Sequence, residues 1–155
     1  PPYASQLNEL TVGSESWGVE WVSWHENQFI IAECQYQLGQ EQESLNTLNN
    51  TLSVLEQRWR EFDQSCQLPR YSDIGGPDLF AAIMNEKYKA MFLNMQSLSD
   101  WRRTGFPLFI DKNGNSTECD GGVPRRLLYP ELEKKTNSNV PPGDSIFDRV
   151  ENDPS

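Results

Sequence analysis

The stretch FIIAECQYQLGQEQESLNTLNNTLSVLEQRWREF, residues 29–62, decides the fold of this chain. In its second half, apolar residues recur at alternating intervals of three and four, which is the spacing of one helix face. They are Leu45, Leu48, Leu52, Leu55, Trp59 and Phe62. A helical period also runs from Trp21 to Leu38, where Gly39 then offers the left-handed conformation common at helix ends. Because so few residues separate the two segments, the pattern predicts an antiparallel helical hairpin over residues 20–62.

The rest of the chain predicts one more long helix and then little regular structure. Pro77 and Asp78 favour a helix start, and apolar residues continue along one face as far as Leu98. We therefore expect a third helix over residues 78–101 and an irregular, turn-rich segment over 102–155. The methionines of the third helix are interpreted as core residues rather than as a peptide-binding surface. The fold class that follows is mainly α.

The hairpin resembles a single tetratricopeptide unit. Leu38 and Gly39 stand before the turn as such a unit requires, and Ser44 occupies a position where alanine is expected. No second copy of the pattern is visible in the sequence. Because a lone unit of this kind buries its faces only against stacked neighbours, we expect residues 20–62 to have one apolar side uncovered.

Charge and hydropathy narrow the range of partners. The chain has 155 residues, with 13 Lys+Arg against 23 Asp+Glu and a net charge of −10. This excess of acid repels nucleic acid and anionic membrane surfaces. A mean hydropathy of −0.69, together with the lack of a long apolar run, predicts no membrane-spanning helix. The length is that of one domain.

Side chains able to carry metal or catalytic chemistry are few. His25 is the only histidine and lies in a predicted helix, so neither a zinc site nor a serine-histidine pair is expected. One polar loop suggests calcium, but its glycines and acids are in the wrong order for that ion, which favours a solvated turn. Its oxygen-bearing residues are Asp111, Asn113, Asn115 and Asp120. We expect no catalytic residue, no metal and no cofactor. Cys34 is expected to be a buried thiol, and pairing of Cys66 with Cys119 is left open.

Two pairs of adjacent arginines stand out in so acidic a chain, Arg102 with Arg103 and Arg125 with Arg126. A guanidinium offers five donors, enough to satisfy several carbonyls or a carboxylate where regular structure is scarce. We therefore predict that the four arginines, with Trp101 beside the first pair, are structural residues that fasten the C-terminal segment to the third helix. Binding of a sugar or a phosphate is the alternative.

Sugar recognition pairs aromatic surfaces with hydrogen-bonding side chains, and one part of the chain gathers both. Trp17, Trp21 and Trp24 lie there among acids, an amide and His25. Trp21 and Trp24 are expected to pack in the core of the hairpin. Trp17, in a loop of glycine and serine, is the candidate ligand-binding residue.

Two stretches near the C-terminus carry a family resemblance, NEKYKAMFLNMQSLSDWRRTGFPLF at residues 85–109 and VPRRLLYPELEKKTNSNV at residues 123–140. In order and spacing they resemble the C-terminal part of the SusD/RagB-like family of outer-membrane nutrient-binding lipoproteins. Upstream, the run Ala32-Glu33-Cys34 is similar to the Ala-Glu-Ala of the last tetratricopeptide-like hairpin in that family.

The resemblance implies that residues 1–155 are the C-terminal portion of a longer protein that binds a nutrient and is not an enzyme. It implies capture of a glycan or oligosaccharide by a lid partner of a SusC-like TonB-dependent transporter, at the cell surface of a Bacteroidetes-type outer membrane. The lipid anchor and the usual carbohydrate site would precede Pro1, so no binding residue is carried over. The competing interpretation is a tetratricopeptide-type scaffold for protein–protein interaction.

Overall fold

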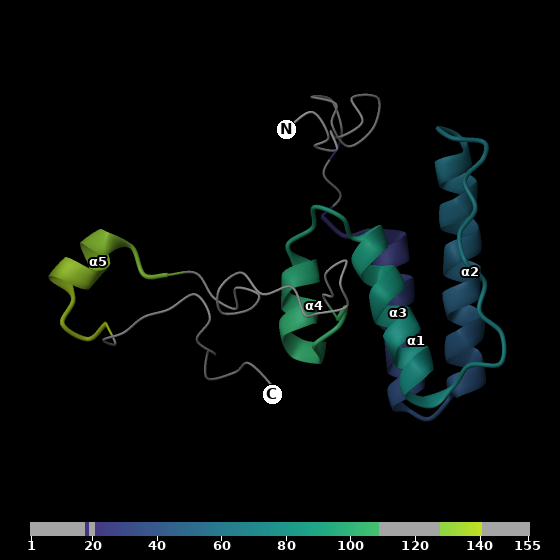
Figure 1. The fold of residues 1–155 in the computed structure, drawn as a ribbon, viewed down its shortest axis with the longest axis horizontal. Helices are drawn as coiled ribbons and strands as arrows, with labels where there is room; N and C mark the ends of the chain where they lie inside the picture. Colours follow the sequence, from purple (N-terminus) through teal and green to yellow (C-terminus); the bar gives the residue numbers. More distant parts are fainter. Residues whose placement is uncertain (1–17, 19–20, 109–127, 141–155) are drawn as a thin grey trace, which may run out of the picture.

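The computed structural model describes residues 18, 21–108 and 128–140, and all regular structure in this part of the chain is helical. The helices are α1 (Trp24–Gln37), α2 (Glu41–Arg60), α3 (Gly76–Ala90), α4 (Gln96–Thr104) and α5 (Glu131–Thr136). The first four form one bundle, and α5 lies apart from it (Figure 1). The mainly α fold expected from the sequence is confirmed.

Local chemistry at both ends of α1 produces the expected antiparallel hairpin with α2. The Ser23 hydroxyl caps the start of α1 by accepting a hydrogen bond from the Glu26 amide at 3.1 Å. The helix therefore begins after this cap rather than at Trp21. At the other end Gly39 has a left-handed φ of +76°, and its amide donates to the Tyr36 carbonyl at 2.9 Å. This glycine stop turns the chain directly into α2.

The core lies between α1, α2 and α3. Its most deeply buried apolar side chains include Phe29 of α1, Leu48 and Leu52 of α2, and Leu79 and Ile83 of α3. The four leucines of the α2 seam are buried as predicted, whereas Phe62 lies beyond the helix end and is exposed. Ser44 is buried between the hairpin helices, where its hydroxyl donates to the Ala32 carbonyl at 2.7 Å. That hydrogen bond lets a polar side chain occupy the position expected for alanine.

The single helix predicted over residues 78–101 is wrong, because the chain divides it in two. α3 ends at Ala90, α4 begins at Gln96, and Leu93 in the connection has a left-handed φ of +65°. α4 then packs back against α3. Of the three methionines expected in the core, two are buried, but Met95 lies in the connection and is 83% exposed.

Polar side chains in the connection explain the break. The Ser97 hydroxyl donates to the Met91 carbonyl at 2.9 Å, and the Asn94 side chain accepts from the Gln96 amide at 2.8 Å. In a continuous α-helix the Met91 carbonyl would instead accept from the Met95 amide, and the Gln96 amide would donate to the Phe92 carbonyl. Short polar side chains that compete for them favour a turn over a helix.

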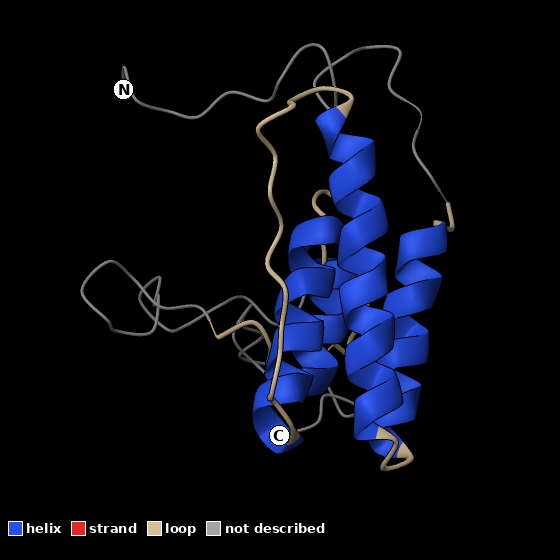
Figure 2. Cartoon of the chain, turned by 90° about the vertical axis from the view of Figure 1, so that its right-hand side faces the viewer, coloured by secondary structure: helices blue, strands red, loops and turns tan. Residues whose placement is uncertain are grey.

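The connection between α2 and α3 runs back along α2 as an extended chain (Figure 2). Asn49 pairs with it as a neighbouring strand would, donating to the Tyr71 carbonyl at 2.8 Å and accepting from the Tyr71 amide at 2.9 Å. Glu56 accepts from the Leu68 amide and from the Arg70 guanidinium, each at 3.0 Å. The bond from Leu68 is the largest cause of a lowered pKa at Glu56, and nearby guanidinium groups lower it further.

The outward face of α1 is apolar and uncovered in the described part of the chain. Trp24, Ile31 and Leu38 lie along it at intervals of seven and are exposed. Cys34 is exposed as well, so the prediction of a buried thiol is wrong. The reason is that the buried side of the helix is occupied by Phe29 and its neighbours. An uncovered side of this kind agrees with the expectation for a lone hairpin.

The segment predicted to be irregular over residues 102–155 contains regular structure at two places. α4 continues to Thr104 and ends at Gly105, whose φ is +75° and whose amide donates to the Trp101 carbonyl at 2.7 Å. The short helix α5 follows Pro130 and has acids in its first turn and lysines in its last. That charge order suits the helix dipole and accounts for a helix where none was predicted.

Candidate functional site

The tryptophans around the start of α1 are not core residues. Trp24 is 48% exposed and Trp21, which precedes the helix, is 95% exposed, so the prediction that both pack in the core is wrong. The buried side of α1 carries Phe29 and Ala32, whereas Trp24 is the first residue of the helix, directly after the Ser23 cap, and Trp21 lies before it. Trp17, the candidate ligand-binding residue, lies outside the described residues.

Trp24 lines a groove between the start of α1 and the second half of α2, which we call the Trp24 groove. Its volume is about 420 Å³. The lining residues are Val22, Ser23, Trp24 and His25 from the α1 end and Val54, Leu55 and Arg58 from α2. An aromatic face thus shares one groove with an imidazole and a guanidinium, which are side chains that donate hydrogen bonds.

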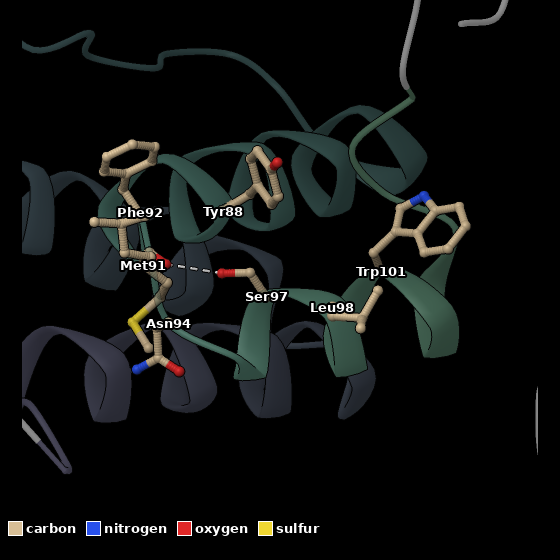
Figure 3. Close-up of a pocket in the computed structure, with 8 residues that line it drawn as sticks. Tyr88, Met91, Phe92, Asn94, Ser97, Leu98 and Trp101 are labelled. Atoms are coloured by element: carbon tan, nitrogen blue, oxygen red, sulfur yellow. Dashed lines mark hydrogen bonds between the residues drawn. The ribbon is translucent and has the colours of Figure 1, made fainter. Parts of the chain in front are cut away.

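A second groove, the α3–α4 groove, opens at the break between those helices (Figure 3). Its volume is about 390 Å³, and its lining residues are Tyr88, Met91, Phe92, Leu93, Asn94, Ser97, Leu98 and Trp101. Figure 3 shows Tyr88 and Phe92 on the α3 side and Leu98 and Trp101 on α4. The Ser97 hydroxyl donates a hydrogen bond to the Met91 carbonyl. The walls carry no charged side chain and are mainly apolar.

A series of ion pairs beside the α3–α4 groove ties three helices together. Lys87 Nζ of α3 lies 2.6 Å from Asp100 Oδ2 of α4, and the lysine side chain is only 5% exposed. The second oxygen of Asp100 accepts from Arg103 at 2.9 Å. The Arg103 guanidinium also donates hydrogen bonds to both carboxylate oxygens of Glu33 on α1. These bonds, chiefly the ones to Glu33, raise the pKa of Arg103 above its usual range, so the guanidinium stays charged.

Of the four arginines predicted to be structural residues, the two that the structure describes lie in different surroundings. In the described part of the chain, the partners of Arg103 are carboxylates of α1 and α4. Arg102 is partly buried, and its Nε has no hydrogen-bond partner in the described part of the chain. Trp101 beside it is buried. Arg125 and Arg126 lie outside the described residues.

Sequence reasoning missed two residues that hold the bundle together. Lys87 lies on an otherwise apolar helix face, and a charge in that position is the signal of a buried ion pair. Phe106 packs edge-on against Phe80 with ring centroids 5.8 Å apart, and Phe80 stacks on Tyr36 at 5.2 Å. This aromatic series holds the chain that follows α4 against α3 and α1.

Metal chemistry finds no support in the described residues. Among them, no three His, Cys, Asp or Glu side chains are grouped so that they could hold a metal ion. Cys66 is a free thiol, while Cys119 and the candidate calcium loop at 111–120 lie outside that part. In the same part of the chain no helix has the length and apolar character needed to cross a membrane.

The class of protein follows from a family match that covers most of the bundle. Residues 21–130 match a family described as starch-binding and associating with the outer membrane. The chain belongs to this SusD-like family, which confirms the resemblance seen in the sequence. No curated protein and no solved structure matches the chain.

The stretches that carry the resemblance also supply the ion pairs. Lys87, Asp100 and Arg103 come from residues 85–109, and Glu33 comes from the upstream run. These residues connect helices and do not line either large groove. Family membership therefore identifies the kind of protein, whereas the ligand site has to be argued from the grooves.

Proposed function

We propose that this chain binds a neutral glycan of the starch type without transforming it. The observation that carries the proposal is the match of residues 21–130 to a starch-binding, outer-membrane-associated family. The Trp24 groove supports it, because an aromatic surface flanked by hydrogen-bond donors is the chemistry that sugars require. The net charge of −10 favours a neutral polysaccharide over an anionic one.

The proposal extends to location and partner. We infer that the protein works at the cell surface, held by a lipid anchor, and that it passes its glycan to a SusC-like TonB-dependent transporter. The resemblance of residues 85–140 supports both points. The chain carrying an affinity tag and purified from its own outer membranes should bring down such a transporter in equal amount. Recovery of the chain alone under mild detergent would refute the partnership.

Electrophoresis in a native gel that contains soluble starch tests binding. The full chain should migrate more slowly in this gel than in a plain gel, while serum albumin migrates equally in both. Unchanged mobility in starch and in other neutral polysaccharides would refute glycan binding. Chromatography of the starch after incubation should show no shorter saccharides, and their release would instead make the protein a hydrolase.

A scaffold for protein–protein interaction is the second candidate, and the uncovered apolar face of α1 favours it. Ile31 and Leu38 lie on that face and line neither groove. The substitutions Ile31→Lys and Leu38→Lys should leave starch binding intact if the glycan proposal is right. If they abolish every interaction of the chain and wild type ignores starch, the scaffold is the better description.

A further inference from the structure

We propose that the Trp24 groove is the sugar-binding subsite of this chain, with the Trp24 ring as the stacking surface and Arg58 and His25 as hydrogen-bond donors. This inference rests on the proposed function, because it takes a neutral glycan as the ligand. The family match names a class of ligand but no site. The argument for the site comes from the walls of the groove.

Trp24 supplies the part of the site that fits a pyranose. A sugar ring presents a flat face of C–H groups, which packs on an aromatic ring as an apolar surface does. About half of Trp24 is exposed, so part of its surface is open to a ligand. Its backbone is also held in place, since Trp24 follows the buried Ser23 cap directly and begins α1. A stacking surface on a rigid helix end loses little entropy when a ligand binds.

The polar part of the site comes from both helices. His25 lies next to Trp24 on α1, and Arg58 projects from α2 on the other side of the groove. Sugar hydroxyls both donate and accept, and a guanidinium with several N–H groups can reach two neighbouring hydroxyl oxygens. Val54 and Leu55 complete the lining with apolar surface. The groove therefore combines the two kinds of contact that orient a sugar.

The other groove has no guanidinium. The α3–α4 groove is of similar volume, but its polar lining consists of the uncharged Tyr88, Asn94 and Ser97. A guanidinium alone carries five N–H groups, more than these three side chains offer together. A volume of about 420 Å³ lies near the lower end of ligand sites, so the Trp24 groove suits a short segment of a glycan chain.

Calorimetric titration of the full chain with maltoheptaose tests the inference. Trp24→Ala should weaken binding about tenfold, since it removes the aromatic contact, and Trp24→Phe should weaken it less. Phe92→Ala is the matched control, because Phe92 is an exposed aromatic side chain in the α3–α4 groove. Its affinity should equal that of wild type. Circular dichroism melts establish that each variant is folded.

A second variant keeps the test decisive if Trp24→Ala does not fold. Val54→Trp adds bulk to the groove from α2 and leaves the start of α1 untouched, so it should block maltoheptaose as well. If wild type binds and the folded groove variants bind equally well, the subsite is wrong while the proposed function stands. Loss of binding in Phe92→Ala alone would move the site to the α3–α4 groove. If wild type binds neither maltoheptaose nor starch, the proposed function itself fails.

Discussion

The Trp24 groove and the α3–α4 groove are nearly equal in volume, yet different kinds of side chain line them. The first combines an aromatic ring with cationic and imidazole side chains and depends on a helix cap. The second is mainly apolar, and the Lys87–Asp100 ion pair lies directly behind it, in contact with the same small cavity as Met91. Size alone therefore says little about what a hollow binds. The comparison also implies that either groove can be disturbed without the other.

Loss of the lysine behind the α3–α4 groove should have the largest effect. Lys87→Ala leaves Asp100 partly buried with one partner fewer, and breaking a buried pair costs about 3 kcal/mol or more. Urea denaturation should show this drop in the free energy of unfolding. Lys135→Ala is the control, since Lys135 is an exposed lysine of α5. Equal losses in the two variants would mean that burial of Lys87 has no energetic weight.

Comparing Arg103 with its neighbour Arg102 shows how much stability the ion pairs with carboxylates contribute, since both arginines lie in the last turn of α4. Arg103→Ala removes the bonds to Glu33 and Asp100 and should cost about 2 kcal/mol, discounted because the guanidinium is half exposed. Arg102→Ala removes no ion pair in the described part and should cost less. A thermal melt compares them. A larger loss for Arg102→Ala would shift the fastening role to that residue.

The cap of α1 gives a way to loosen the Trp24 groove alone. Ser23→Ala should cost about 1 kcal/mol, while Ser23→Asp, which keeps a capping oxygen, should cost little. Hydrogen exchange should rise at the start of α1 and stay unchanged in α4. Maltoheptaose should bind Ser23→Ala more weakly, because the start of α1 positions Trp24. Uniformly faster exchange in every helix would show that the two regions are not independent.

Glu56 lies on neither groove and should give the smallest effect. Its pKa is lowered in the folded chain, so its contribution to stability is present above its usual value of 4.5 and is lost as the pH falls below that value. The melting temperature of Glu56→Gln should therefore fall less than that of wild type when the pH is lowered from neutral to acid. Identical slopes for both proteins would show that this carboxylate carries no pH dependence.

Much of the fold could be predicted because its signals are local. The leucine seam of α2 and the glycine after α1 specify helices and a turn within a few residues of sequence, and both appear as expected. The break after α3 escaped prediction because the apolar pattern continues through it. Ser97 and Asn94 decide the break through hydrogen bonds to the backbone, which periodicity does not reveal.

Less of the candidate site could be predicted, because it depends on which side of α1 faces the bundle. Aromatic residues are usually assigned to the core, but α1 buries the side that carries Phe29 and leaves Trp24 about half exposed. Arg58 joins the groove only because α2 folds back beside the start of α1. The partnership of Lys87 with Asp100 likewise requires α4 to reverse direction. Such pairings are properties of the tertiary structure, not of any single stretch of sequence.

The bond between Glu33 and Arg103 joins residues that are 70 positions apart, whereas the α1–α2 hairpin closes across a three-residue turn. Bringing distant segments together costs more chain entropy than closing a short turn, so the hairpin should assemble early and α4 should dock last. If unfolding follows the reverse of this order, α4 is the first helix of the bundle to detach. Native-state exchange should show its amides opening before those of α2.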